Sequence, residues 1–208
     1  MTAELSDSLA GIGVLPVIVI DDPRAARPLA EALRAGGVGC AEVTLRTPAG
    51  RDSIAEMSAV EGFLVGAGTV LTVEQLDASA AAGARFAVSP GFDGQLVDRA
   101  MSSGVLAIPG IATASETMAA MRAGVRTVKL FPAAQLGGPA MIAALRGPFP
   151  EMSFVPSGGI DIDNVADYGI DGVLCVSTSW IAPRAMIAQR DFATIAERAR
   201  AFVSRRRS

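Results

Sequence analysis

The sequence predicts an α/β fold in which eight parallel β-strands alternate with eight helices and close into a single-domain (β/α)8 TIM barrel. Short β-branched runs alternate with Ala-rich amphipathic stretches along the 208 residues. These units recur at a spacing of about 20 to 25 residues, which is typical of βαβ units. Because no linker or change in composition divides the chain, we expect one domain over 1–208. Residues 1–10 are expected to form an N-terminal segment, and 204–208 a basic solvated tail.

Each predicted strand is a short apolar run bounded by turn residues. In chain order the strands are 14–20, 40–46, 63–69, 86–90, 105–109, 127–131, 153–157 and 172–177. The stretches between them have the apolar spacing of helices, and three begin with a proline that a first helical turn tolerates. The predicted helices are 23–35, 48–59, 73–82, 95–103, 114–123, 139–145, 162–168 and 192–203. Glycines directly before the next strand indicate left-handed C-caps at Gly36-Gly37, Gly83, Gly104, Gly124 and Gly169.

A doubly wound open sheet is the alternative arrangement for the same alternation. Such sheets commonly carry a G-x-G-x-x-G turn after the first strand, and this chain has none there. Gly66-Ala67-Gly68 lacks the third glycine and falls in the third unit, and no P-loop pattern occurs. The barrel is therefore the favoured arrangement.

Composition excludes several classes of function. A net charge of -3 argues against a nucleic-acid or anionic-membrane partner. The chain contains no histidine, which excludes Ser-His-Asp and Cys-His nucleophile systems and His-rich metal sites. We expect neither a metal nor a cofactor. Cys40 and Cys175 lie in predicted strands and are expected to be free, buried thiols. With no secretion signal in the first residues, these thiols predict a cytoplasmic protein.

Lys129 is the only lysine in the chain and lies in an apolar run, whereas every other basic residue is an arginine. A lysine amine can lose its proton and attack a carbonyl, but a guanidinium remains protonated. Lys129 is therefore a candidate Schiff-base nucleophile. The alternative is a lysine at a strand end whose ammonium group reaches water.

Strand alternation brings polar residues to one side of the predicted sheet. Glu42 and Arg46 share a face of the second strand, and Lys129 and Phe131 share a face of the sixth. If the apolar faces pack beneath the helices, Glu42, Arg46 and Lys129 converge inside the barrel or at its rim. This set suits a lysine-dependent aldolase, in which Glu42 moves protons and Arg46 holds a substrate carboxylate. A structural Glu-Lys-Arg network is the alternative interpretation.

Two loops extend this candidate site. Ser157-Gly158-Gly159 ends the seventh strand, and Ser177-Thr178-Ser179 follows the eighth. TIM barrels often bind phosphate with the loops after strands seven and eight. The placement therefore indicates a phosphate site, although such a turn can also be only a turn.

The chain resembles the 2-keto-3-deoxy-6-phosphogluconate (KDPG) aldolases and the related 4-hydroxy-2-oxoglutarate (KHG) aldolases. Eight blocks carry the resemblance: LPVIVI (15–20), EVTLR (42–46), VGAGTV (65–70), SPG (89–91), IPG (108–110), KLFPA (129–133), PSGGI (156–160) and SW (179–180). The resemblance implies a (β/α)8 barrel, a homotrimer and metal-free class I chemistry on a 2-keto acid, with pyruvate as a product. It places the Schiff base on Lys129 and acid–base work on Glu42. For the substrate it implies contacts to Arg46, Thr69, Pro90, Phe131, Ser157, Gly158, Gly159 and Ser179.

One block departs from the family pattern. Ser177-Thr178-Ser179 stands where the family usually has Gly-Gly-Ser, so the added side chains could hinder a phosphate or offer it hydroxyl groups. The expected reaction is cleavage of 2-keto-3-deoxy-6-phosphogluconate to pyruvate and glyceraldehyde 3-phosphate. Three alternatives stay open: cleavage of 4-hydroxy-2-oxoglutarate to pyruvate and glyoxylate, a non-covalent phosphate-binding isomerase or synthase, and a non-catalytic sugar-phosphate binding protein.

Overall fold

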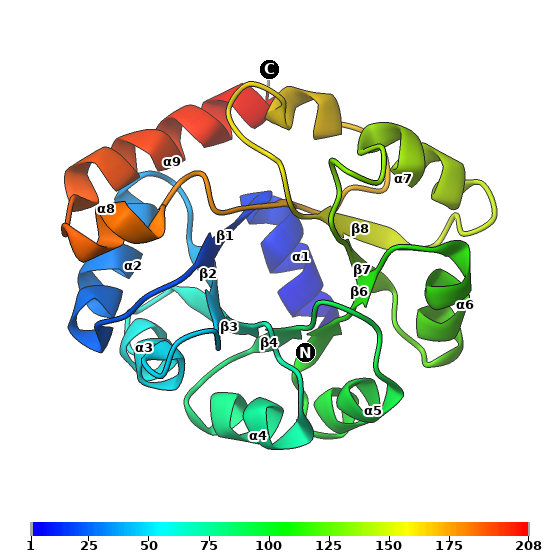
Figure 1. Cartoon of the computed structure of the whole chain (residues 1–208), viewed down its shortest axis with the longest axis horizontal. Coiled ribbons are helices and arrows are strands. Elements are labelled where there is room, and N and C mark those ends of the chain that lie inside the picture. Colours follow the sequence, from blue (N-terminus) through cyan, green and yellow to red (C-terminus); the bar gives the residue numbers. More distant parts are fainter. Residues whose placement is uncertain (1, 208) are drawn as a thin grey trace.

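The computed structural model describes residues 2–207 and has an α/β fold in which all paired strands are parallel. Its strands are β1 (Val14–Ile18), β2 (Cys40–Thr44), β3 (Leu64–Gly68), β4 (Phe86–Val88), β5 (Leu106–Ile108), β6 (Gly110–Ile111), β7 (Thr127–Leu130), β8 (Ser153–Pro156) and β9 (Val176–Thr178). One sheet has the order β5-β4-β3-β2-β1-β9, and a second has the order β6-β7-β8. Figure 1 shows the strands around a common centre with helices outside them.

The two sheets meet at two places. Pro109 lies between β5 and β6, where its missing N–H leaves a gap in the ladder. On the other side, single parallel bridges join Phe154 to Val173 and Ser157 to Ser177. The strands of both sheets therefore share one interior.

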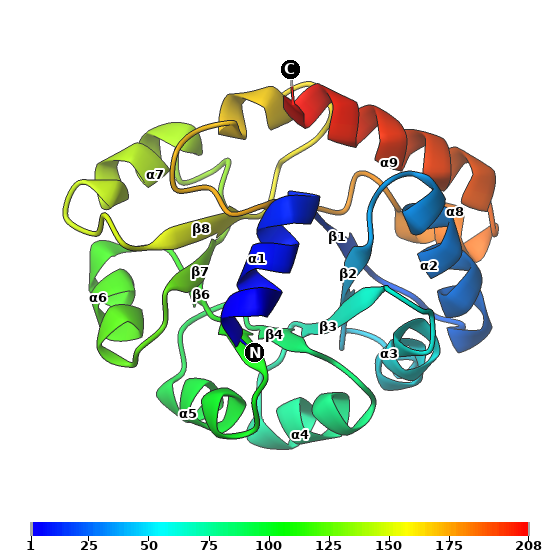
Figure 2. The ribbon, with the colours of Figure 1, turned by 180° about the vertical axis from the view of Figure 1, so that it is seen from behind.

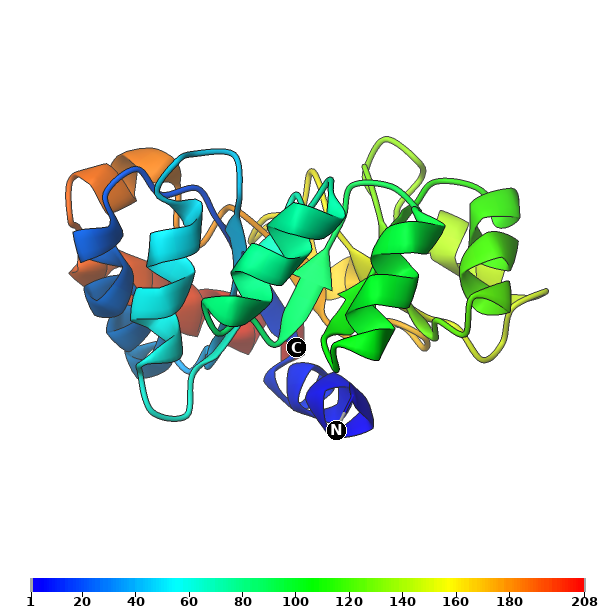
Figure 3. The same cartoon turned by 90° about the horizontal axis from the view of Figure 1, so that it is seen from below.

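Helices cover the outer side of this ring (Figures 1 and 3). They are α2 (Ala26–Ala35), α3 (Gly50–Ser58), α4 (Val73–Ala81), α5 (Gly94–Ser102), α6 (Ala114–Arg122), α7 (Pro139–Arg146), α8 (Arg184–Ala188) and α9 (Phe192–Arg207), with 3-10 turns η1 (Pro23–Ala25) and η2 (Val165–Tyr168). Helix α1 (Thr2–Ile12) instead crosses one end of the ring (Figure 2). Within residues 2–207, none of the helices combines the length and hydropathy that a bilayer crossing requires.

Several expectations for the helices need correction. The predicted helix at 162–168 is only the short 3-10 turn η2, and Gly169, with φ of -74°, is not a left-handed cap. The N-terminal segment forms α1, which places Leu9 in the core. At the other end, α9 continues to Arg207, with 204 and 205 exposed and Arg206 partly buried; residue 208 of the predicted tail lies outside the described residues.

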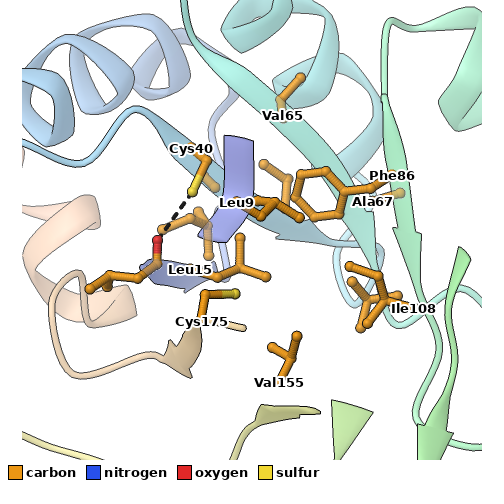
Figure 4. Close-up of a cluster of buried hydrophobic side chains, with 14 of the residues drawn as sticks. Leu9, Leu15, Cys40, Val65, Ala67, Phe86, Ile108, Val155 and Cys175 are labelled. Atoms are coloured by element: carbon orange, nitrogen blue, oxygen red, sulfur yellow. Dashed lines mark hydrogen bonds between the residues drawn. The ribbon is translucent and has the colours of Figure 1, made fainter. Parts of the chain in front are cut away.

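The interior at the α1 end of the ring is apolar (Figure 4). Leu9 reaches it from α1, and Leu15 from β1. Gly66 is required here, because a Cβ at this position would lie 2.2 Å from the ring of Phe86. Cys40 and Cys175 are buried and unpaired, which confirms the expected free thiols, and the Cys40 thiol donates to the Val14 carbonyl at 3.1 Å.

Candidate active site

Lys129 and Glu42 form a buried ion pair inside the ring. Lys129 lies on β7 and Glu42 on β2, 87 positions apart in the chain. The Lys129 Nζ donates to Glu42 Oε1 at 3.2 Å and lies 3.5 Å from Oε2. Lys129 is 7% exposed and Glu42 is 1% exposed. The predicted alternation of these strands is therefore correct, and Lys129 does not reach out to water.

The backbone of β3 makes room for the Glu42 carboxylate. Gly68 on β3 pairs with Thr44, two residues beyond Glu42. A Cβ on Gly68 would lie 2.4 Å from Glu42 Oε1, so a larger residue cannot fit without moving the carboxylate. This close packing leaves the carboxylate little room to move. Because a buried charge without a partner is costly, the carboxylate stays in contact with the Lys129 ammonium.

The ion pair lies in a cavity of about 200 Å³ at the carboxyl ends of the strands. This cavity gathers nine of the ten residues that were predicted for the site: Glu42, Arg46, Pro90, Lys129, Phe131, Ser157, Gly158, Gly159 and Ser179. Thr69 is the exception, because it is absent from the cavity lining. It follows β3 with a φ of 58°, in the left-handed region that few residues other than glycine adopt.

The cavity also has lining residues that were not assigned a role in advance. Val17 and Ile160 supply apolar wall, and Ser177 and Thr178 supply the first two positions of the unusual loop. Nothing in the sequence around Val17 could have singled it out, because β1 is apolar on both faces and buried throughout. Ser177 did carry a signal, namely its departure from the family pattern.

An aromatic ring and a guanidinium stand at the cavity mouth. Phe131 is 40% exposed although it is a large apolar side chain, and its ring centroid lies 5.5 Å from Lys129 Nζ. Arg46 follows β2 and is exposed. An exposed aromatic ring beside a buried amine suits contact with a bound organic molecule.

The loop after β8 lines the cavity with two glycines. Gly158 and Gly159 have φ angles of 98° and 75°, which favour glycine. Their carbonyls accept hydrogen bonds from Ala134 N and Asn164 Nδ2, at 3.1 and 2.9 Å. Within residues 2–207, the N–H groups of these two glycines donate to no backbone carbonyl. They are therefore available to an anion.

A larger cavity of about 360 Å³ lies at the opposite end of the ring. It is bounded by α1 and by the amino ends of β5 and β7, with Asp7 and Arg126 among its lining residues. Neither Lys129 nor Glu42 contributes to it. Cavity size alone therefore does not select a candidate site. The buried amine–carboxylate pair makes the smaller cavity the candidate.

Residues 5–198 match the family described as KDPG and KHG aldolase. The chain belongs to this family. It is 42% identical over 196 residues to the 2-dehydro-3-deoxy-phosphogluconate aldolase of Pseudomonas aeruginosa, covering 93% of this chain and 89% of that one. It is likewise 42% identical to the KHG/KDPG aldolase of Escherichia coli strain K12, covering 90% and 89% of the two chains.

Among solved structures, the chain is similar to the KDPG aldolase of Legionella pneumophila. The TM-score is 0.90 at 41% identity, with 94% of this chain and 96% of that chain covered. That crystal structure holds pyruvate captured at low pH as a covalent carbinolamine intermediate. The similarity therefore covers nearly all of the chain.

Proposed function

We propose that this member of the family is a class I aldolase that cleaves 2-keto-3-deoxy-6-phosphogluconate to pyruvate and glyceraldehyde 3-phosphate. The observation that carries the proposal is the buried contact of 3.2 Å between Lys129 Nζ and Glu42 Oε1 in a cavity open to substrate. An amine that forms a covalent intermediate needs an acid–base partner within reach, and Glu42 is placed to serve. The covalent pyruvate adduct of the Legionella relative supports the same chemistry here.

The proposed reaction uses both members of the ion pair. Lys129 passes its ammonium proton to Glu42, and the neutral amine adds to the substrate keto carbon to form a carbinolamine. Glu42 then returns that proton to the carbinolamine hydroxyl, which leaves as water and gives an iminium ion. The hydroxyl on carbon 4 then gives its proton to Glu42, and the bond between carbons 3 and 4 breaks. The electron pair of that bond moves into the iminium and gives an enamine. Protonation of carbon 3 and addition of water release pyruvate and free Lys129. Glu42 thus accepts a proton in one step and returns it in another.

The remaining cavity residues are proposed to hold the two ends of the substrate. Arg46 and Pro90 are assigned to the carboxylate end, and Phe131 to the carbon chain. Ser157, Gly158, Gly159 and Ser179 are assigned to the phosphate, since free N–H groups and hydroxyls favour an anion. Thr69 follows β3 directly but does not line the cavity. Its contact with the carboxylate end of the substrate therefore stays a prediction.

Reductive trapping tests the lysine chemistry. Borohydride reduction with pyruvate should add one reduced pyruvyl group, and peptide mass analysis should locate it on Lys129. Lys129→Ala should abolish the adduct, and the N-terminal amine serves as an internal control because it is the only other primary amine. If wild-type protein forms no adduct, the Schiff-base proposal fails and a non-covalent isomerase or synthase becomes the better explanation.

A second candidate substrate is 4-hydroxy-2-oxoglutarate, because the Escherichia coli relative is named for both activities. It would use the same lysine and release glyoxylate in place of a phosphorylated aldehyde. Comparison of kcat/KM for the two substrates decides between them. We expect the phosphorylated substrate to be preferred, and a preference for the unphosphorylated acid would contradict this choice.

Two further features belong to the same proposal. We infer that the two sheets form one closed eight-stranded barrel, with β5 and β6 as a single strand interrupted at Pro109. The isolated bridge between Ser157 and Ser177 supports closure on the other side. We also infer a homotrimer. Its molar mass by sedimentation equilibrium should be three times the 21.2 kDa of one chain. The cytoplasmic location stays a prediction.

A further inference from the structure

We propose that Ser177 is a specificity-determining residue whose hydroxyl binds an oxygen atom of the aldehyde-derived half of the substrate. The proposal rests on the aldolase function above and deepens it. It assigns a role to a side chain at a position where the family usually has glycine.

The three hydroxyls of the 177–179 loop have different surroundings. Thr178 Oγ1 donates to the Ile160 carbonyl at 2.7 Å and accepts from Trp180 N at 3.0 Å, so it fastens the loop. Ser179 is exposed at the mouth of the cavity. Ser177 is fully buried, and its Oγ has no hydrogen-bond partner among residues 2–207. Of the three, Ser177 alone is both buried and available.

Strand pairing explains why Ser177 faces the cavity. Ser177 of β9 pairs with Leu15 of β1, whose side chain belongs to the apolar interior in Figure 4. Paired residues of neighbouring strands point to the same side of a sheet, so the Ser177 side chain also points inward. It lines the same cavity as Lys129 and Glu42.

An unpartnered buried hydroxyl needs an explanation, because a polar group that is removed from water without a hydrogen bond destabilises the folded protein. Ser53 and Ser79 are also buried and unpartnered, but they lie on α3 and α4 and line no part of the cavity. Ser177 differs because it adjoins the space that the substrate must enter. A bound substrate can satisfy it, and this makes the open hydroxyl useful.

The arrangement of the strands indicates which half of the substrate it meets. Arg46 and Pro90, assigned to the carboxylate end, follow β2 and β4. Ser177 lies on β9, which pairs with β1, and it bridges to Ser157 directly after β8. Ser157 begins the loop assigned to the phosphate. Ser177 therefore belongs to the aldehyde side of Lys129, where the carbon chain carries hydroxyl oxygens.

The test compares Ser177→Ala, which removes only the hydroxyl, with Ser177→Gly, which restores the usual family residue. Ser79→Ala is the matched control, because it removes an equally buried and unpartnered hydroxyl outside the cavity. Two readouts are needed for each variant. One is kcat/KM for cleavage of 2-keto-3-deoxy-6-phosphogluconate, and the other is the rate of borohydride-trapped adduct formation with pyruvate alone, which lacks the aldehyde half.

We expect Ser177→Ala and Ser177→Gly to lower kcat/KM for cleavage about 3- to 10-fold, the range for loss of one hydrogen bond. Adduct formation with pyruvate should stay at the wild-type rate, and Ser79→Ala should change neither readout. Unchanged cleavage by both Ser177 variants, as expected if the hydroxyl stays without a partner when substrate is bound, would overturn the proposal. An equal loss in both readouts would also overturn it, since that indicates a general disturbance of the site. Absence of any pyruvate adduct in wild-type protein would instead overturn the aldolase function.

Discussion

At the residue scale, the decisive feature is that two opposite charges are removed from water together. An ion pair this deep is poor evidence for stability, because the desolvation of both groups offsets their attraction. If Lys129 and Glu42 served only structure, well-packed apolar residues would stabilise the core as well or better. Their position in an open cavity therefore favours chemistry over support.

Glu42→Gln tests the acid–base role. The amide is nearly the same size as the carboxylate and should keep the fold, but it cannot take up a proton from the substrate. We expect kcat for cleavage to fall by a factor of about 100 or more, the usual range for loss of a general acid–base group. The thermal unfolding temperature serves as the control for folding. Near-wild-type turnover would show that Glu42 does not carry the proton.

Gly68→Ala tests how the carboxylate is positioned. The added Cβ would lie 2.4 Å from Glu42 Oε1 and 2.5 Å from its Cγ, so the side chain must move. Overpacking of this kind typically costs about 1–3 kcal/mol in the free energy of unfolding, and we expect kcat to fall with it. Gly94→Ala is the matched control, because its Cβ would meet nothing within 4 Å. Equal behaviour of the two variants in urea unfolding and turnover would contradict this account.

At the element scale, the helix between β6 and β7 shows how local sequence fixes a boundary. Thr113 is the N-cap of α6, and its Oγ1 accepts from Glu116 N at 3.2 Å. The Glu116 carboxylate accepts in return from Ala112 N and from the Thr113 hydroxyl, both at 2.8 Å. This reciprocal arrangement resembles a capping box, with the carboxylate bound to the N–H of the residue before the N-cap, and it stabilises the start of the helix.

Thr113→Ala should lower the free energy of unfolding by about 1 kcal/mol, the typical value for loss of an N-cap side chain. Thr113→Ser keeps the hydroxyl and is the control.

The hydrogen bond from Ala112 N holds the pKa of Glu116 below its ordinary value of 4.5. A lowered pKa gives stability that is present above pH 4.5 and lost as the pH falls through the folded pKa. The difference between wild type and Glu116→Gln in urea unfolding should therefore shrink in acid; a constant difference would contradict it.

Most elements could be predicted from the sequence because their signals are local. Seven of the eight apolar runs contain a strand, and a run such as 127–131 has the pattern of a buried parallel strand. The eighth run, 172–177, overlaps β9 (Val176–Thr178) at only two residues. The turn at 162–168 could not be predicted, because apolar spacing does not separate a 3-10 turn from a short helix. Helix α1 does carry a signal in the sequence, because Leu5 and Leu9 are four residues apart, and both are buried.

For the site, alternation along two strands was enough to predict that Glu42 and Lys129 both point into the interior. The contact itself depends on how β2 and β7 are brought across the interior, which no local pattern states. The left-handed backbone at Thr69 was also beyond prediction, because a threonine adopts that conformation only when the surrounding structure imposes it. The free hydroxyl of Ser177 needed coordinates, since its neighbour Thr178 is equally polar but fully bonded.

At the scale of the whole molecule, the interior changes character along its length. The part of the interior drawn in Figure 4 is filled with apolar side chains and two thiols, a cavity of about 360 Å³ lies between α1 and the amino ends of β5 and β7, and the other end holds the ion pair and its own cavity. The filled part gives the rigid support that a precise site requires. Because the thiols lie within that support, their reactivity reports whether the whole fold is intact.

We expect neither thiol to react with a disulfide reagent at pH 8 while the protein is folded. Burial raises the pKa of Cys175 to about 12 and raises that of Cys40 well above 9.0, so almost no thiolate is present. In concentrated urea, the same assay should count both thiols per chain, which provides the control. Raised pKa values also mean that the folded state keeps protons which the unfolded state releases above pH 9. Stability should therefore fall as the pH rises from 9 towards 12. Rapid labelling of the native protein at pH 8 would show that the α1 end opens without global unfolding.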